Sequence, residues 1–388
     1  MGENTKIEWC DHTFNPWRGC QKVASGCANC YAESQSKRNT KTLGVWGPNG
    51  TRVVAAESAW RQVEKWDREA RCRCGPRFGD RKCAWCKAGC HRPSVFCGSM
   101  CDVFEDWQHP VLRHDGCTMW KCHECGVWRD GALPAVQTVA PWCYQHTACK
   151  PLTLSDVRAH VFNLIDATPN LTWLLLTKRP ENVRTMWEPF ADTVYADGSS
   201  GEDIDEPPAP MSEYPAPKRD NVWLGTSIAC QEDAERNIPE LLKCRDLCRG
   251  VFLSIEPLIG PVDVSEWLHD SDCHYRDGVC HCSDPRESHI DQVIIGGESG
   301  PNARPCNIDW IRSIARQCEA AGVLCMVKQI GSNPVGLRFS IDDNGRPFCI
   351  ENDSFRGGAK PLDKKGGDPA EWPEDLRKYR SLAWKGGV

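Results

Sequence analysis

The chain has 388 residues, enough for one large α/β domain with insertions or for two smaller domains. Its net charge is −6 and 40% of its residues are hydrophobic, an ordinary balance that does not by itself require a polyanionic partner. The first residues include no apolar run typical of a signal peptide, and no segment approaches the roughly 18 apolar residues of a membrane span. We therefore expect a cytoplasmic protein that has no membrane partner.

Cysteine and tryptophan are unusually frequent, with 26 and 17 residues. Structural disulfides are rare in a reducing compartment, so closely spaced cysteines indicate metal binding. We expect many of the tryptophans, such as Trp17, Trp173 and Trp223, to lie in the core. The isolated cysteines are expected to be small buried residues, and these are Cys10, Cys230, Cys306, Cys318, Cys325 and Cys349.

The sequence pattern predicts strands at 6–9 and 94–103, followed by a helix at 157–165. Beyond residue 171, short apolar runs typical of strands buried on both faces alternate with helix-like segments. The predicted strands are 172–177, 222–227, 251–255, 292–295 and 323–327, and the predicted helices are 180–187, 231–248 and 307–321. This alternation predicts an α/β fold with a parallel sheet, either open or closed into a barrel.

Three Cys-rich segments interrupt the alternation, at 72–92, 110–150 and 269–289. None has a strong apolar period, and so short a segment cannot build a hydrophobic core alone. The predicted divisions are a barrel start with a cysteine loop (1–71), the first insertion (72–92), a barrel strand (93–109), the second insertion (110–150) and the rest of the barrel (151–388). The last part includes an acidic, proline-rich loop at 197–218, the third insertion and a C-terminal extension.

Each insertion carries cysteines, or cysteines and histidines, at spacings typical of structural zinc sites. The expected ligands are Cys72, Cys74, Cys83 and Cys86 in the first insertion, Cys122, Cys125, Cys143 and His146 in the second, and Cys273, Cys280, Cys282 and His289 in the third. Cys117 or Cys149 is an alternative ligand in the second site, and His281 in the third. Auxiliary iron–sulfur clusters are the alternative at all three sites, and histidine favours zinc at the second and third.

The first insertion is also strongly basic. Seven Lys or Arg residues lie between positions 71 and 92 against a single acid, Asp80, and Phe78 and Trp85 lie among them. A basic patch with aromatic side chains fits a nucleic-acid partner. The alternatives are a solvated stabilising flap or a surface that docks a partner protein.

Cys20, Cys27 and Cys30 follow the spacing C-x6-C-x2-C in a loop that contains Gly19 and Gly26. Three thiolates from one loop can bind three irons of a cubane cluster and leave the fourth iron open. A structural zinc site normally has four ligands, so a three-cysteine set indicates a coordination position kept for another ligand. Cys10 and His12 are near enough in sequence to complete a zinc site instead.

Several segments of this chain, taken in order, resemble a phage-associated three-cysteine protein family of unassigned function that is related to radical S-adenosylmethionine (SAM) enzymes. The segments are IEWCDHTFNPWRGC, SGCANCYAE, LLTKRPENV, NVWLGTSI, LSIEPLIGPVD, VIIGGESGPNARP, VKQIG and DKKGGDPAEWPEDLR. The resemblance extends from Ile7 to Ile330 and continues near the C-terminus.

This resemblance implies a partial parallel (β/α) barrel of the radical-SAM type, with a [4Fe-4S] cluster in the loop after the first strand. The open iron would bind SAM, and one electron would cleave it to methionine and a 5′-deoxyadenosyl radical, chemistry that the cofactor supplies. A reductant protein would provide the electron, and a further protein is a candidate partner. A phage-encoded protein would work in the cytoplasm of its bacterial host.

Ligands of parallel α/β folds bind beyond the carboxyl ends of the strands, and the inferred strand ends of this chain carry polar or small residues. The candidate cofactor-binding residues are Ser99, Asp102, Lys178, Arg179, Ser227, Glu256, Gly296, Gly297, Glu298 and Lys328. The glycines would let the backbone approach SAM, a cation would pair with its carboxylate, and a glutamate would bind ribose hydroxyls or the amino group. The alternative is that the charged residues form salt bridges that hold the barrel together.

The first functional hypothesis is therefore a radical SAM enzyme with zinc-binding insertions, acting on a nucleic-acid base. A second is a zinc-stapled nucleic-acid-binding or adaptor protein without catalysis. The third, a zinc hydrolase that uses the cysteine triad, ranks last because three thiolates make zinc a poor Lewis acid. Catalytic residues, substrate and oligomeric state are not predicted.

Overall fold

The computed structural model describes residues 2–70, 92–113, 116–122, 128–129, 149–187, 217–268, 275–276, 279–280, 289–343, 347–351 and 361–380. Most of the three predicted insertions lies outside these residues, so the predicted zinc sites stay predictions. Outside the description are Cys72, Cys74, Cys83, Cys86, Cys125, Cys143, His146, Cys273 and Cys282. Cys122 and Cys280 are described only as strand residues, without their side chains.

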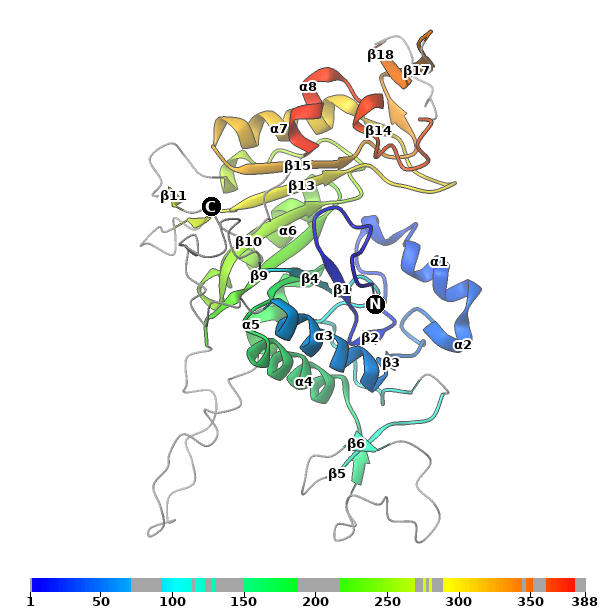
Figure 1. Cartoon of the computed structure of the whole chain (residues 1–388), viewed down its shortest axis with the longest axis vertical. Helices are drawn as coiled ribbons and strands as arrows, with labels where there is room; N and C mark the ends of the chain where they lie inside the picture. The colour runs from blue at the N-terminus through cyan, green and yellow to red at the C-terminus, as the bar shows by residue number, and fades with distance from the viewer. Residues whose placement is uncertain are drawn as a thin grey trace.

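The described residues form a mixed α/β fold around one curled parallel sheet of seven strands, a half-barrel (Figure 1). In order across the sheet, the strands are β1 (His12–Phe14), β4 (Ser94–Cys97), β8 (Thr172–Thr177), β9 (Arg219–Ile228), β10 (Cys248–Ile255), β13 (Gln292–Gly296) and β15 (Leu324–Gln329). Every neighbouring pair is parallel, and the order in space is the order along the chain. All seven strands therefore present their carboxyl ends at the same rim, as the alternation of strand and helix predicts.

The five strands predicted beyond residue 171 are confirmed, and the two predicted before it need correction. Residues 6–9 are not a strand: the Cys10 amide bonds the Ile7 carbonyl at 3.3 Å in a turn, and the first strand is β1. The strand predicted at 94–103 ends at Cys97, because Gly98 adopts a left-handed φ of 102° and turns the chain.

The helices of the structure follow the strands. They are α1 (Tyr31–Arg38), α2 (Thr40–Leu43), α3 (Glu57–Ala70), α4 (Leu154–Ala167), α5 (Val183–Met186), α6 (Gln231–Leu242), α7 (Ile308–Ala320) and α8 (Glu374–Arg377). A capping box between Thr153 and Asp156 begins α4, and Gly322, at φ 67°, follows the end of α7. The helix predicted at 231–248 is too long, since α6 ends at Leu242 and Cys248 already belongs to β10.

The two faces of the half-barrel bury different sets of side chains, because successive residues of a strand point to opposite faces. On the outer face, residues such as Trp173, Leu224 and Leu253 belong to the large core formed with α4, α6 and α7. The inner face carries a second cluster, and the turn before β1 fills it with Trp9 and Cys10. Its other members are Phe96, Leu174, Trp223, Phe252, Ile294 and Met326.

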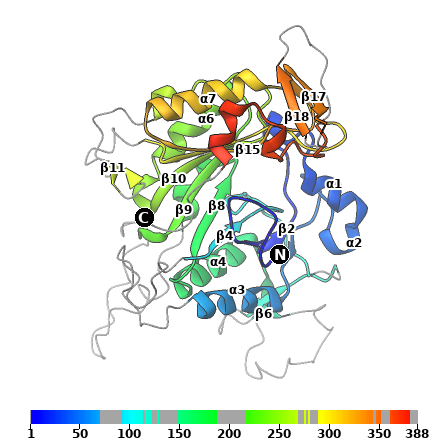
Figure 2. The same cartoon turned by 45° about the horizontal axis from the view of Figure 1, so that its top comes forward.

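Smaller sheets of two or three strands accompany the seven-stranded sheet. They are β2 (Trp17–Arg18) with β3 (Val53–Val54), β5 (Trp120–Cys122) with β6 (Trp128–Arg129) and β7 (Cys149–Pro151), β11 (Tyr275–Arg276) with β12 (Val279–Cys280), β14 (Cys306–Asn307) with β16 (Pro334–Val335), and β17 (Leu337–Ile341) with β18 (Pro347–Glu351). In Figures 1 and 2, α3 and α4 lie at one end of the sheet and α7 and α8 beside β15 at the other. No helix in the described part of the chain is long and apolar enough to cross a membrane.

The C-terminal segment 361–380 packs back on the edge strand β15. The Ile330 amide bonds the Gly366 carbonyl at 2.9 Å, and Arg380 donates to the Lys328 carbonyl at 2.5 Å. Arg380 also pairs with Glu8, just before β1. One arginine thus links the strand at one edge of the sheet to the segment that precedes the strand at the other edge.

The predicted core residues are mostly confirmed. Trp17, Trp173 and Trp223 are buried. Among the isolated cysteines, Cys10, Cys306 and Cys318 are buried, whereas Cys230, Cys325 and Cys349 are partly exposed, contrary to prediction. Cys230 is partly exposed because it lies just after β9, where the chain leaves the sheet to begin α6.

Candidate functional site

The segment 20–30, called the cysteine loop below, carries Cys20, Cys27 and Cys30 between β2 and α1. It lies against residues that follow β8, β9 and β13, as hydrogen bonds to Arg179, Cys230 and Glu298 show. The loop therefore crosses the rim at the carboxyl ends of the parallel strands, the place where ligands of such folds bind.

At the start of the loop, Arg179 contacts two adjacent residues. Its Nη1 lies 3.9 Å from the Cys20 sulfur, and its Nη2 donates to the Gln21 carbonyl at 3.1 Å. The Gly47 amide donates to the Cys20 carbonyl at 2.9 Å. Cys20 is therefore held both by the end of β8 and by the segment after α2.

Asp102 holds the end of β8 in place. Its carboxylate accepts hydrogen bonds from the Thr177 hydroxyl at 2.7 Å, the Lys178 amide at 3.0 Å and Arg179 Nη1 at 2.8 Å. The Phe104 amide is a fourth donor, at 3.1 Å. Asp102 and Arg179 are both predicted cofactor ligands, and in this structure they bond each other and their neighbours.

At the other end of the loop, Glu298 and Arg304 form a second clamp. Arg304 donates to both carboxylate oxygens of Glu298, at 3.0 and 2.7 Å, and to the Ser25 carbonyl at 2.9 Å. Asn29 donates from Nδ2 to Glu298 at 3.0 Å and to the Asn302 carbonyl at 2.9 Å. Glu298, another predicted cofactor ligand, thus fixes the part of the loop that carries Cys27 and Cys30.

The middle of the loop approaches the rim closely at Gly26. A Cβ at this position would lie 3.1 Å from the Cβ of Ala229 and 3.6 Å from Nζ of Lys178. A larger side chain would push the loop away from the ends of β8 and β9. The neighbouring Ser25 hydroxyl contacts the Cys230 sulfur at 3.8 Å.

Ser99 connects β4 to the residues on either side of the cysteine loop. Its hydroxyl accepts a hydrogen bond from Asn15 Nδ2 at 2.9 Å, and its carbonyl accepts one from the Tyr31 hydroxyl at 2.5 Å. Tyr31 directly follows Cys30, so Ser99 helps to fix the start of α1. This predicted cofactor residue has a supporting role in the observed contacts.

Inside the rim, Lys178 and Lys328 differ in their partners. Lys328 pairs with Glu256 at 2.8 Å, and the Ser254 hydroxyl donates to the other carboxylate oxygen of Glu256 at 3.2 Å. Lys178 donates to the Ser227 hydroxyl at 2.5 Å. Within the described residues, no carboxylate pairs with the Lys178 ammonium. It is therefore the predicted rim cation that is best placed to bind an added anion.

Gly296 and Gly297 are needed for packing inside the protein. A Cβ at Gly296 would lie 2.5 Å from Oε1 of Glu256, and one at Gly297 would lie 2.5 Å from the Ile330 carbonyl oxygen. The groups that approach the two glycines in this structure are Glu256 and the backbone after β15, and the predicted approach of a ligand stays a prediction.

The surroundings of Cys20 and Cys30 oppose thiolate formation. Burial raises the pKa of the Cys20 thiol to about 12, Glu105 and Asp102 add to the rise, and Arg179 opposes it. Burial is also the main cause of the raised pKa of Cys30. Both thiols are protonated near neutral pH in the metal-free protein, so metal binding must release those protons.

No three His, Cys, Asp or Glu side chains within the described ranges are grouped closely enough to hold a single metal ion. Three thiolates of a cubane cluster bind three different irons, which needs a wider arrangement than the ligands of one ion. The donor set of the cysteine loop, three thiolates from one loop, suits that cluster in its chemistry. His289 is described, but its predicted partners Cys273, Cys280 and Cys282 are not described as side chains.

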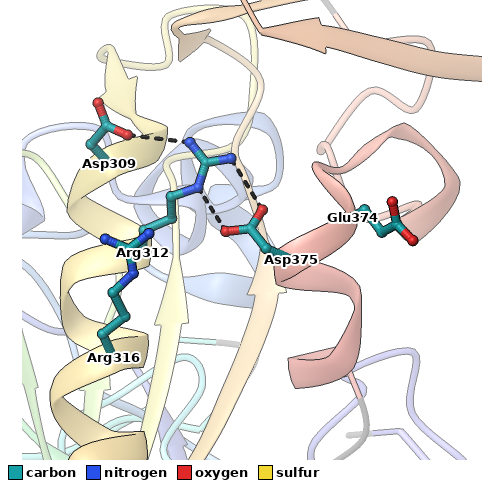
Figure 3. Close-up of a pocket in the computed structure, with 5 residues that line it drawn as sticks. All are labelled: Asp309, Arg312, Arg316, Glu374 and Asp375. Atoms are coloured by element: carbon teal, nitrogen blue, oxygen red, sulfur yellow. Dashed lines mark hydrogen bonds and ion pairs between the residues drawn. The ribbon is translucent and has the colours of Figure 1, made fainter.

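Two of the surface hollows among the described residues are considered for ligand binding. One of about 420 Å³ lies beside the cysteine loop, lined by residues 22–25 and by Glu232, Asp233 and Arg236 of α6. Another of about 620 Å³ lies between α7 and α8 (Figure 3). There Arg312 pairs with Asp309 at 3.3 Å and with Asp375 at 2.8 Å, so its charge is used to fasten the C-terminal segment.

Asn15, Asn29 and Arg304 are among the residues of the site that were not predicted from the sequence. Asn29 and Arg304 lie within the quoted segments SGCANCYAE and GGESGPNARP, but neither is at a strand end. The only sequence signal was their position in these segments, because a contact between two loops leaves no periodic pattern.

No curated protein and no solved structure matches this chain. A family model does match it, over residues 4–122 and 151–351. The matched residues include all three cysteines of the loop and every rim residue described above, whereas 123–150, with Cys125, Cys143 and His146, lie outside the match. The chain belongs to the family described as protein of unknown function DUF5131.

Proposed function

We propose that this protein is a radical SAM enzyme that binds a [4Fe-4S] cluster through Cys20, Cys27 and Cys30. The observation that carries the proposal is the position of the cysteine loop across the polar rim of a parallel half-barrel. Hydrogen bonds from Arg179 and Arg304 fix the loop over this rim. When bound, the cluster would supply the electron that cleaves SAM to methionine and a 5′-deoxyadenosyl radical.

The rim residues divide into supports and a candidate ligand. The supports are Asp102, Arg179 and Glu298, whose ion pairs fix the segments around the cysteine loop. Lys328 is already paired with Glu256. Among the residues that the structure describes, the Lys178 ammonium has only a hydroxyl partner, so it is the residue that would bind the carboxylate of SAM. Its ammonium lies under Gly26, in the middle of the cysteine loop.

The remaining parts of the proposal rest on the sequence. Zinc in the Cys-rich insertions, a nucleic-acid substrate contacted by the basic insertion, and a reductant protein are proposed on the residues quoted above. The phage association and the host cytoplasm are proposed on the family resemblance.

Metal analysis of anaerobically purified protein tests this function. The wild type should contain about four irons and equivalent sulfide per chain, besides zinc. The variant Cys20→Ala/Cys27→Ala/Cys30→Ala should lose the iron and keep the zinc. The control Cys306→Ala/Cys318→Ala, which removes two buried cysteines outside the loop, should keep both. Zinc alone in the wild type, with no iron after reconstitution, would favour the zinc-stapled binding protein instead.

A further inference from the structure

Arg179 contacts the cysteine loop from the end of β8, although only 5% of this residue is exposed. Its two terminal nitrogens reach the Cys20 sulfur and the Gln21 carbonyl, at 3.9 and 3.1 Å. A planar guanidinium has five N–H donors in a fixed fork and can serve several acceptors at once.

Buried carboxylates hold the guanidinium from the other side. Asp102 lies 2.8 Å from Nη1 and Glu105 lies 3.6 Å from Nη2. Glu105 is itself held by Arg52, at 2.6 and 2.7 Å, with both side chains fully buried. The Arg52 guanidinium stacks on Trp107 at 3.8 Å. The orientation of Arg179 is thus set by the protein core and not by the loop.

We propose that Arg179 is a positioning residue that fixes the Cys20 end of the cysteine loop before a metal group binds, and that donates to the Cys20 sulfur once this sulfur is a ligand. The first role concerns the metal-free protein, and the second rests on the proposed function. Hydrogen bonds to ligand sulfurs are among the factors that set the reduction potential of a cluster, since they stabilise its more negative, reduced form.

Lysine cannot replace Arg179 in this role. A single ammonium on a flexible stem cannot reach Asp102, the Cys20 sulfur and the Gln21 carbonyl together. The variant Arg179→Lys keeps the charge beside Asp102 and should lose the contacts to the loop. Arg219→Lys is a matched control, because Arg219 is equally buried and bonds Asp166 at 2.7 and 2.8 Å from the start of β9.

Hydrogen exchange in the metal-free protein tests the first role. The Gly47 amide, which donates to the Cys20 carbonyl, is the reporter, and the helix Glu57–Ala70 is the internal reference. We expect Gly47 and the cysteine loop to exchange at least about tenfold faster in Arg179→Lys, with the reference helix unchanged and with wild-type exchange in Arg219→Lys. Exchange of the loop at the wild-type rate in a folded Arg179→Lys protein would overturn the proposal.

The reduction potential of the reconstituted cluster tests the second role. Arg179→Lys should move the midpoint potential to a more negative value, and Arg219→Lys should leave it unchanged. An unchanged potential in Arg179→Lys would overturn the donation to Cys20. A wild type that binds no iron would end the proposed function, and the exchange experiment would still decide whether Arg179 positions the loop.

Discussion

The inner face of the half-barrel has two halves that are built from the same strands. Toward the amino ends, Phe96, Leu174 and Phe252 pack with Trp9 in an apolar cluster. Two or four residues further along the same strands, the same face carries Lys178, Glu256 and a glycine. Because side chains alternate between faces, these polar residues continue the rows that begin with the apolar ones.

The difference between the two halves distinguishes the part of the inner face that stabilises the half-barrel from the part that is suited to a ligand. The apolar half could have continued to the rim, since apolar layers fill a barrel without the desolvation cost of burying charges. Instead the carboxyl half carries lysines, a glutamate and small residues, covered by the cysteine loop. A polar interior beneath a loop of three thiols is suited to a charged ligand, and the apolar half is suited to stability alone.

The largest expected effect comes from the apolar half. Phe252 is fully buried, and its ring lies on Gly225, where a Cβ would be 2.4 Å from the ring. Phe252→Ala should lower the free energy of unfolding by about 3–5 kcal/mol, because it leaves a cavity in the inner cluster. Urea unfolding measures this change in the free energy of unfolding, and a decrease of less than about 1 kcal/mol would contradict the packing described. Iron binding should be retained at temperatures where the variant is folded.

A smaller effect is expected at the clamp formed by Glu298 and Arg304. Burial raises the pKa of Glu298, but the hydrogen bonds from Arg304 outweigh it and hold the pKa below its usual range. The stabilisation by Glu298 is therefore present above the unfolded value of about 4.3 and is lost as the pH falls through the lower folded value. Glu298→Gln should lower the free energy of unfolding by about 1 kcal/mol at pH 7 and by progressively less in acid. A difference in unfolding free energy between wild type and variant that does not change with pH would contradict this role of Glu298.

The smallest effect on stability is expected at Lys178. Lys178→Met removes a charge that has no carboxylate partner in the described residues. The free energy of unfolding should therefore change by less than about 1 kcal/mol. Binding of SAM to the iron-loaded protein should weaken at least about tenfold, as expected for one charge-assisted hydrogen bond. Lys328→Met is the comparison variant. It removes the cation that pairs with Glu256, so it should lower the free energy of unfolding by more than Lys178→Met does. Wild-type affinity in Lys178→Met would remove Lys178 from the proposed ligand site.

The strands that build the sheet could largely be predicted from the sequence. Consecutive residues are apolar in strands such as Thr172–Thr177 and Gln292–Gly296. The reason is that helices cover one face of the sheet and the inner cluster covers the other face. The first strand could not be placed, because His12–Phe14 is short and partly polar. The nearby Trp9, which suggested a strand, instead fills the inside of the barrel from a turn.

The site was only partly predictable. The parallel topology explains why residues at the carboxyl ends of β4, β8, β9, β10, β13 and β15 were expected at one rim. Their partners could not be predicted, because ion pairs such as Arg179 with Asp102 join residues that are 77 positions apart. The contact of Asn29 with Glu298 spans 269 positions. Long-range pairing decides which charged residues are supports, and Lys178, which has no carboxylate partner among the described residues, is the proposed ligand residue.

Cleavage of SAM by anaerobic, iron-loaded protein after reduction with dithionite tests the proposed radical chemistry directly. We expect the wild type to form 5′-deoxyadenosine, detected by liquid chromatography and mass spectrometry. The variant Cys20→Ala/Cys27→Ala/Cys30→Ala should form none. Iron-loaded, reduced wild type that leaves SAM intact would contradict the proposed radical chemistry.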